Sequence, residues 1–264
     1  MGLFNRLLGG YSALVFAFLY VPLIVLIVFS FSTNKLVSWP FGGITLKWYY
    51  EVLANTQIMQ ALYNTLIVGV ITAIITTAIG VTSTFGVMRY FNRKVAFIIL
   101  AFLVFPELIP DMVKGIAELM FFVEQNISLS LWTVIIGHVV FCIPYTALLT
   151  AARVVSLDVS LEEASMDLGA GRFETFRHIT LPLMTPAIFS SIIFAFTLSI
   201  NDYLVTVFIT GPQPLLPLVF WGMMHFGISP VINAISTIIF VISLAAALIG
   251  FYLMTRTGKK IAFF

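Results

Sequence analysis

The chain has 264 residues, of which 61% are hydrophobic and only 9% are charged, and its formal net charge is +2. Soluble domains carry about 25% charged residues, so this composition excludes an ordinary soluble domain and favours a multispanning membrane protein. A single cysteine, Cys142, excludes a disulfide framework and a cysteine-based metal site.

Six apolar segments predict an all-α fold of six membrane helices, because lipid offers the backbone of a single span no other hydrogen-bond partners. The first segment, Tyr11–Phe31, holds about 21 uncharged residues, which exceeds the apolar core of a signal peptide. We therefore expect an uncleaved first helix and one transmembrane domain over residues 1–264. The predicted spans are 11–31, 61–88, 95–123, 131–152, 183–203 and 231–254.

The lysines and arginines predict the orientation of these spans, because basic residues concentrate on the cytoplasmic side of a membrane. Six spans place most of the 13 basic residues on one side. Both termini and the segment 153–182 are then cytoplasmic, in the plasma or inner membrane of a prokaryote. The residues on that side are Arg6, Arg89, Arg93, Lys94, Arg153, Arg172, Arg177, Arg256, Lys259 and Lys260. The remaining three are Lys35, Lys47 and Lys114.

Two segments outside the spans carry apolar residues. Trp39–Gly43 predicts a turn, and Thr45–Leu53 predicts a short interfacial helix whose aromatic residues, Trp48 among them, anchor at the membrane surface. Leu215–Phe226 is apolar but too short to cross, so we expect a re-entrant or surface-lying helix there.

Prolines and charges interrupt the third span. Pro106 and Pro110 predict a break or a kink, because proline removes a backbone N–H and clashes with the preceding helical turn. If a new helix starts after the break, Asp111, Lys114 and Glu118 share one of its faces.

Two interpretations of these charges remain open. Lys114 pairs with Asp111 and Glu118 as a structural clamp, or the acids line the route of a cation. Ionisable residues at membrane depth usually face the bundle interior or a wet cavity, and the surplus of acids favours a cationic solute. Nearby aromatic rings can add cation–π contacts to an ammonium group. The residues predicted for the route are Glu107, Asp111, Glu118, Asp202 and Tyr203.

No constellation in the sequence predicts catalysis or a metal site. His138, His178 and His225 are scattered and lack ligand spacing. His138 and Cys142 stand four residues apart in the fourth span, and packing explains both. We therefore expect neither catalytic residues nor metal ligands, which argues against a membrane-embedded enzyme.

The polar segment 153–182 predicts two short helices. Val159–Leu168 is the first, with Ser160 as N-cap and Glu163 completing a capping box. A glycine, Gly169 or Gly171, is expected to end this helix.

The second short helix is predicted over Phe173–Ile179, and Pro182 is expected to open the fifth span. A compact helical unit with charges of both signs suits docking against a soluble partner.

This segment also carries a spaced pattern. Its fixed positions are Glu163, Ala164, Ser165, then Gly169 after three residues, then Ile179, Leu181 and Pro182 after nine more. The pattern resembles the "EAA" signature of permease subunits of ATP-binding-cassette importers, with Ser165 in place of the second alanine. The resemblance implies a coupling helix that sits in a cleft of an ATPase subunit. The coupling residues that it implies are Glu163, Ala164, Ser165, Asp167, Gly169, Leu181 and Pro182.

Further motifs resemble the second permease subunit of spermidine/putrescine transporters over nearly the whole chain. In those permeases an acid follows a proline in the third span, and Pro110-Asp111 matches it. An acidic pair ends their fifth span, whereas Asn201-Asp202 keeps one acid here. Lys114 stands where an uncharged residue is usual. The other similar motifs are Ser30–Ser32, Lys47–Tyr49, Phe141–Tyr145, Leu161–Ala170, Phe196–Ser199 and Gly211-Pro212.

The resemblance implies a transmembrane subunit of an ATP-driven polyamine importer. The chain has no G-x-x-x-x-G-K-[ST] motif, so we expect no cofactor on it and place ATP with Mg²⁺ on partner subunits. The partners implied are two ATPase subunits, a second homologous permease and an extracytoplasmic polyamine-binding protein, besides membrane lipid and without nucleic acid.

Two alternatives to a polyamine importer stay open. One is ATP-driven import of another small solute. The other is an ion-coupled secondary transporter with Glu107, Asp111 and Asp202 as proton or cation sites. Six spans without a visible inverted repeat argue against the second alternative.

Overall fold

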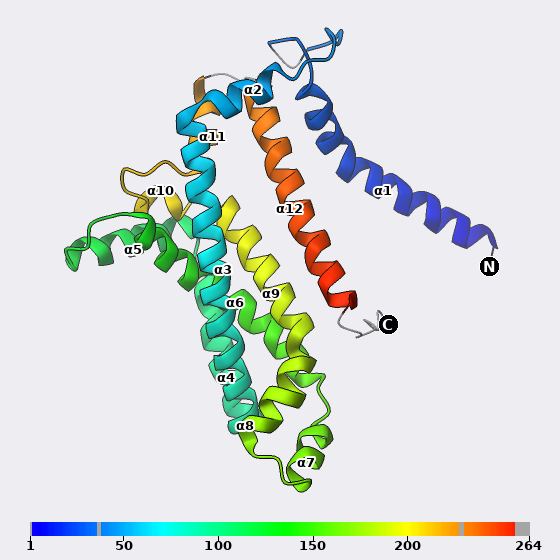
Figure 1. The fold of residues 1–264 in the computed structure, drawn as a ribbon, viewed down its shortest axis with the longest axis vertical. Coiled ribbons are helices and arrows are strands. Elements are labelled where there is room, and N and C mark those ends of the chain that lie inside the picture. Colours follow the sequence, from blue (N-terminus) through cyan, green and yellow to red (C-terminus); the bar gives the residue numbers. More distant parts are fainter. Residues whose placement is uncertain (1, 36–37, 227–229, 257–264) are drawn as a thin grey trace. The chain divides into compact units, whose positions relative to one another are not determined.

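The fold is all-helical over the residues that the computed structural model describes, which are 2–35, 38–226 and 230–256 (Figure 1). One isolated antiparallel bridge joins Ser32 and Ile44. The all-α prediction is confirmed for this part of the chain. The helices are α1 Gly2–Phe29, α2 Lys47–Ala54, α3 Thr56–Tyr90, α4 Arg93–Val104, α5 Asp111–Glu124, α6 Leu131–Val155, α7 Ser160–Asp167, α8 Arg172–Thr175, α9 Leu181–Asn201, α10 Thr206–Ile209, α11 Leu216–Phe226 and α12 Pro230–Arg256.

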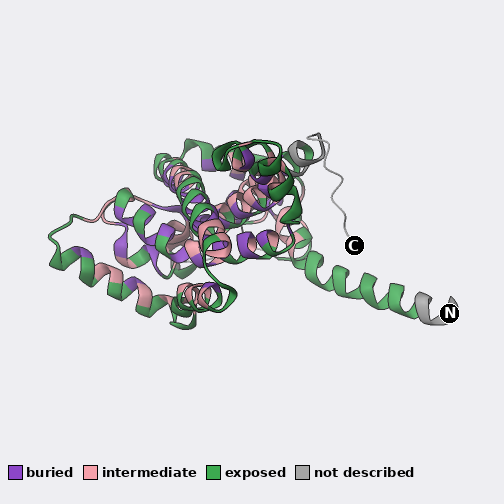
Figure 2. Ribbon diagram, turned by 90° about the horizontal axis from the view of Figure 1, so that it is seen from below, coloured by how far each residue is buried: buried purple, intermediate pink, exposed green. Residues whose placement is uncertain are grey.

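The chain forms two compact units. One consists of Met1–Gln60 with Val219–Leu244, and the other of Ala61–Leu218 with Ala245–Phe264. Every residue predicted for the solute route or for coupling lies in the second unit. In the first unit α1 exposes most of its residues, as the green helix at the N-terminus shows (Figure 2).

Five described helical stretches are long and apolar enough to cross a membrane, namely α1, α3, α6, the stretch from α8 through α9, and α12. The pair α4 and α5 supplies a sixth if it counts as one broken span, since it bends by 97°. The predicted third span over 95–123 is therefore two helices, Arg93–Val104 and Asp111–Glu124, on the two sides of the prolines. The predicted break is confirmed.

Two prolines explain the bend. The short 3-10 helix Phe105–Leu108 follows α4, with Pro106 in its first turn. Ile109 is extended, with φ −84° and ψ 132°, because the ring of Pro110 disfavours a helical conformation in the residue before it. A new helix, α5, starts at Asp111, because the residues after Pro110 have backbone N–H groups that can donate helical hydrogen bonds.

Small residues bring α3, α6 and α9 close together. A Cβ atom at Gly80 of α3 would collide with Thr146 of α6, and one at Gly69 would collide with Phe196 and Ile200 of α9. Close backbone approach at small residues is the usual way in which membrane helices pack. The apolar core of this unit gathers beside these contacts and includes Val68, Val134, Ile135, Val205 and Ile209.

The short helices predicted outside the spans are present as α2 and α11. The Leu216 N–H at the start of α11 donates to Thr65 Oγ1 of α3 over 2.8 Å. Trp48 of α2 is buried and donates its Nε1–H to the Ser32 carbonyl over 2.6 Å. The expectation that Trp48 faces the membrane surface is therefore wrong, because its indole N–H satisfies a loop carbonyl instead.

The fifth span begins earlier than predicted. Helix runs without a gap from Arg172 to Asn201, so the separate second helix predicted over Phe173–Ile179 is wrong. Residues Phe176–Thr180 form a π-helical turn in which the Leu181 N–H donates to the Phe176 carbonyl. This widened turn lies directly before Pro182, whose missing N–H interrupts the α-helical ladder without ending the helix.

Candidate functional site

The N-terminus of α7 is capped by Asp158, a residue that lies before the helix. The Ser160 N–H donates to Asp158 Oδ1 over 3.0 Å, and this bond holds the pKa of the Asp158 carboxyl below its usual range. Ser160 is the first helical residue and makes no side-chain cap, so the predicted capping box with Glu163 is wrong. An acid before the first turn serves in its place, since a carboxylate accepts free amides and favours the positive end of the helix.

Gly169, one of the two glycines predicted for this role, ends α7. Its φ is +93°, a conformation that glycine adopts at little cost. The N–H of Gly169 donates to the Met166 carbonyl over 2.9 Å, and that of Ala170 to the Ser165 carbonyl over 3.2 Å. These two bonds form a Schellman motif, which satisfies the last carbonyls of α7 and reverses the chain toward α8.

Glu162 fastens α7 to two membrane helices. Its Oε1 lies 2.9 Å from Arg89 Nη2 at the end of α3 and accepts a 2.9 Å hydrogen bond from Thr180 Oγ1. The side chains of Glu162 and Arg89 are each 16% exposed, so the pair is largely shielded from water. A second contact, 3.2 Å between the hydroxyls of Ser165 and Thr175, joins α7 to α8. Neither Glu162 nor its contact with Arg89 was predicted from the sequence.

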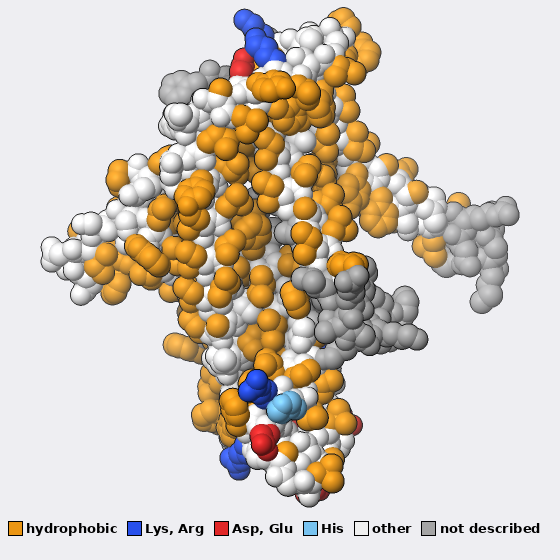
Figure 3. Space-filling view, in the orientation of Figure 1, with side chains coloured by type: hydrophobic (Ala, Val, Ile, Leu, Met, Phe, Trp, Pro, Cys, Tyr) orange, Lys and Arg blue, Asp and Glu red, His pale blue; other side chains and the backbone are white. Residues whose placement is uncertain are grey.

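The opposite face of α7 is open. Glu163, Ala164, Asp167 and Gly169 are exposed, whereas Ser165 is half-buried at its contact with Thr175. Charged side chains gather at this end of the unit, below a hydrophobic surface (Figure 3). Exposed apolar side chains stand among them, with Leu168 89% and Phe173 73% exposed. The predicted coupling positions Leu181 and Pro182 lie at the start of α9.

A cavity of about 530 Å³ opens between the end of α3 and the short helices α7 and α8. Its walls include Phe85, Arg89, Glu163, Met166 and Phe173, so they are mainly apolar and carry both charge signs. This end of the unit therefore combines a firmly held helix, an exposed apolar surface and a cavity. These are properties of a surface that receives another protein.

The bend between α4 and α5 gathers a second group of predicted residues. Lys114 Nζ lies 2.7 Å from Asp111 Oδ1 and 3.4 Å from Glu107 Oε2. The Tyr145 hydroxyl of α6 donates to the same Glu107 oxygen over 2.6 Å. Lys114 therefore connects acids on both sides of the break.

Glu118 does not join this pairing, so the clamp interpretation holds for Asp111 and not for Glu118. Its Oε2 is buried and has no hydrogen-bond partner in the described part of the chain. Glu118 approaches Gly137 of α6, where a Cβ atom would collide with its carboxylate. Gly115 likewise lets α5 approach Val205 and Phe208 at α10, where a Cβ atom would collide with the Phe208 ring.

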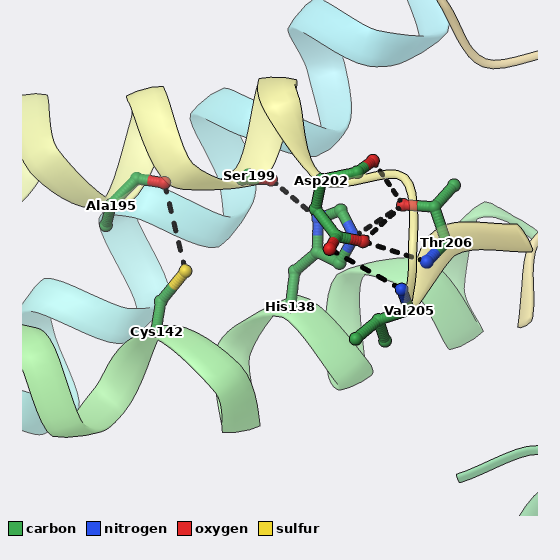
Figure 4. Close-up of polar contacts among 7 residues, drawn as sticks. All are labelled: His138, Cys142, Ala195, Ser199, Asp202, Val205 and Thr206. Carbon is green, nitrogen blue, oxygen red and sulfur yellow. Dashed lines mark hydrogen bonds and ion pairs between the residues drawn. The ribbon is translucent and has the colours of Figure 1, made fainter. Parts of the chain in front are cut away.

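Asp202 lies in a buried cluster at the end of α9 (Figure 4). Its Oδ2 accepts hydrogen bonds from the Thr206 N–H over 2.8 Å and from Thr206 Oγ1 over 2.9 Å. His138 Nε2 lies 3.4 Å from the same oxygen, and the side chains of His138 and Asp202 are only 2% and 7% exposed. Tyr203 follows Asp202 in the turn before α10.

His138 makes polar contacts through both ring nitrogens, so packing alone does not explain it. Its Nδ1 lies 2.7 Å from Ser199 Oγ of α9, and its Nε2 lies 2.9 Å from Thr206 Oγ1 of α10 (Figure 4). Burial with both ring nitrogens in hydrogen bonds indicates a structural tie between α6, α9 and α10. In the described part of the chain no three His, Cys, Asp and Glu side chains group as metal ligands.

The structure thus divides the predicted route residues between two clusters. Glu107 and Asp111 surround Lys114, whereas Asp202 faces His138 and Thr206. Their role in moving a solute stays a prediction.

Three comparisons with known proteins agree with this architecture. Residues 77–262 match the family described as "Binding-protein-dependent transport system inner membrane component". The chain is 36% identical to the spermidine/putrescine transport system permease protein PotC of Escherichia coli K12, over 97% of each chain. It is 33% identical to the putrescine transport system permease protein PotI of the same strain, over 93% of this chain and 89% of that one.

Solved structures share the fold. A bacterial alginate ABC transporter, in complex with a periplasmic protein carrying an alginate pentasaccharide, superposes with a TM-score of 0.75 at 14% identity. The match covers 98% of this chain and 96% of that one. An amino acid ABC transporter matches with a TM-score of 0.59 at 15% identity, over 81% of this chain and 100% of that one.

The resemblance predicted from the EAA-like pattern is confirmed, and the chain is homologous to the PotC and PotI permeases. The chain belongs to the binding-protein-dependent transport system inner membrane components, the permease family of ATP-binding-cassette transporters.

Proposed function

We propose that the chain is the transmembrane subunit of an importer that moves polyamines, spermidine or putrescine, with ATP hydrolysed by partner subunits. The observation that carries this substrate class is the relation to PotC, at 36% identity over 97% of the chain. The cluster around Lys114 adds chemical support, because carboxylates and aromatic rings bind ammonium groups.

In this proposal α7 is the coupling helix. It is fastened through Glu162 to α3 and to the continuous helix Arg172–Asn201, so a force on α7 reaches both membrane helices. Its other face exposes Glu163 and Asp167, and Leu168 after α7 and Phe173 of α8 are exposed as well. That mixture of charged and apolar side chains fits a soluble ATPase subunit. ATP with Mg²⁺ then binds to that subunit, and this chain is no enzyme itself.

The full assembly contains two ATPase subunits, a second homologous permease and an extracytoplasmic polyamine-binding protein. The chain lies in the plasma or inner membrane of a bacterium, with both termini and α7 on the cytoplasmic side, in line with its basic residues. The binding protein delivers solute at the outer mouth, and closure of the ATPases on α7 turns the membrane helices to the inward-open state.

The proposed solute route runs past Glu107, Asp111, Glu118, Asp202 and Tyr203. Buried and half-buried carboxylates in a membrane bundle make this route attractive to a cation and repel anions. Glu107 and Asp111, on the two sides of the break in the third span, both lie next to the Lys114 ammonium, which brings their charges to one place.

Uptake of labelled spermidine and putrescine tests the proposal. Cells starved of polyamines, with all partner subunits present, are compared with and without this gene. We expect uptake that depends on the gene and is competed by unlabelled polyamine. If uptake does not depend on the gene while the complex assembles, the importer carries another small solute.

A further inference from the structure

The break between α4 and α5 creates a small cage around one nitrogen atom. Asp111 Oδ1 and Glu107 Oε2 approach Lys114 Nζ from the two sides of the break, at 2.7 and 3.4 Å. The ring of Phe141 lies on another side, with its centroid 4.7 Å from the nitrogen. The Lys114 side chain is only 11% exposed, so these groups enclose its ammonium.

The walls of the cage are held in place by α6 and α9. The Tyr145 hydroxyl donates 2.6 Å to the Glu107 oxygen that faces Lys114, which fixes the orientation of that carboxylate. Tyr145 packs against Phe141 with ring centroids 5.8 Å apart and against Phe194 of α9 at 5.7 Å. Two oriented carboxylates and an aromatic face make a site for a primary ammonium, whatever chain bears it.

We propose that this cage is a binding site for a primary ammonium group of the solute, and that Lys114 occupies it as a tethered stand-in when solute is absent. The solute's identity as a polyamine rests on the proposed function. The lysine ammonium is a compact point charge on a flexible stem, so a free ammonium of the same chemistry can replace it.

The charges around the cage favour exchange of Lys114 for a solute ammonium over a permanent ion pair of Lys114 with Glu107 and Asp111. Two carboxylates face one ammonium, which leaves a surplus negative charge for an incoming cation. The Asp111 side chain is 42% exposed, so an incoming ammonium group can reach the cage at this wall.

Displaced Lys114 has a second partner within reach. Glu118 stands four residues further on α5, hence on the same helical face, and its Oε2 is buried without a hydrogen-bond partner among the described residues. Buried polar atoms normally have a hydrogen-bond partner, so an oxygen without a partner in the solute-free state is explained if Lys114 binds it in the solute-bound state. Solute arrival then moves Lys114 from Glu107 and Asp111 to Glu118.

The test uses a monoamine on the complete complex, purified with its partner subunits in lipid nanodiscs. Lys114→Met empties the cage and keeps an unbranched side chain. Ethylammonium chloride is the probe, with ethanol as its neutral analogue and tetramethylammonium as a cation too large for the cage. The thermal midpoint of the complex is measured against probe concentration.

We expect ethylammonium to raise the midpoint of Lys114→Met by about 5 °C in a saturable manner, because a ligand that binds only the folded state stabilises it. Wild type, whose cage is filled, should shift by less than half as much. Ethanol and tetramethylammonium should have no saturable effect. Adding Glu107→Gln to Lys114→Met should abolish the response.

An equal shift in wild type and Lys114→Met, or equal shifts with ethylammonium and tetramethylammonium, overturns the proposal. If Lys114→Met does not assemble, Lys114→Gln replaces it. Failure of both variants to assemble, even when purified in ethylammonium, shows a structural clamp and also overturns the proposal. Since no uptake is measured, a negative polyamine uptake assay leaves this result unaffected, and the two failures are distinguishable.

Discussion

Arg89 and Glu162, 73 residues apart in the chain, form a largely shielded salt bridge of 2.9 Å that joins the end of α3 to α7. Thr180 donates to the same carboxylate oxygen, so one side chain links three helices. Neighbouring Glu163 is exposed, and its side chain has no ion pair or hydrogen bond among the described residues. The two adjacent glutamates therefore have separable roles, one toward the membrane helices and one toward the outer face of α7.

Glu162→Gln should uncouple transport from ATP hydrolysis. The substitution removes the charge opposite Arg89 and costs about 1–3 kcal/mol of local stability, because the guanidinium loses its charged partner. We expect ATPase binding to survive, while solute uptake per ATP hydrolysed falls several-fold in proteoliposomes. The matched control, Glu163→Gln, should instead weaken ATPase co-purification. An unchanged transport ratio in Glu162→Gln would show that this link transmits nothing.

Gly169→Ala should destabilise the end of α7. An alanine at φ +93° costs about 1–2 kcal/mol, whereas Gly171 has a φ of −68° that alanine adopts freely. We expect Gly169→Ala to reduce the amount of ATPase subunit recovered with the permease, and Gly171→Ala to leave it near the wild-type amount. Equal recovery with both variants would contradict a role for the shape of this turn.

Gly80→Ala and Gly86→Ala compare two positions on one helix. A Cβ atom at Gly80 would collide with Thr146 of α6, whereas one at Gly86 meets nothing within 4 Å. We expect Gly80→Ala to lower the thermal midpoint of the complex by several degrees. Gly86→Ala should raise stability slightly, by up to about 1 kcal/mol, because alanine is the better helix former. Equal midpoints would argue against close packing of α3 on α6.

Asp202→Asn should reduce uptake of a polycation far more than it reduces complex assembly. The amide keeps one oxygen to accept the Thr206 N–H, so the turn before α10 retains its cap while the negative charge is lost. Uptake of labelled spermidine at matched expression is the measurement.

His138→Phe serves as the structural control for Asp202→Asn. Phenylalanine leaves the buried hydroxyls of Ser199 and Thr206 without their ring-nitrogen partners, so assembly itself should fall. Equal uptake by Asp202→Asn and wild type would remove Asp202 from the proposed route.

Local signals in the sequence were sufficient for the long apolar helices and for the turn at Gly169, but not for the start of the helix Arg172–Asn201. Runs of apolar residues predict spans, and a glycine after a polar helix predicts a left-handed cap, because both depend on neighbours in the chain. The prolines likewise predicted a break before Asp111. Its angle of 97° was not predictable, because packing of Gly115 against Val205 and Phe208 directs α5.

The pairings at the candidate sites were not predictable from the sequence. Glu162 and Arg89, or His138 and Thr206, meet only because α3, α6 and α9 pack together, and no local pattern marks such partners. The predicted pair of Lys114 and Glu118 failed for the same reason. The helical spacing is compatible with that pair, but the bend between α4 and α5 brings Glu107 next to Lys114 instead.

The continuous helix from Arg172 to Asn201 has a mechanical consequence. Its 30 residues extend for about 45 Å, the thickness of a membrane with its headgroups. The α7 contact through Thr180 lies near one end, and the polar tie between Ser199 and His138 lies at the other. Because both contacts lie on one continuous helix, a displacement of Thr180 by α7 is transmitted along the helix axis to the contact with His138, without local unfolding.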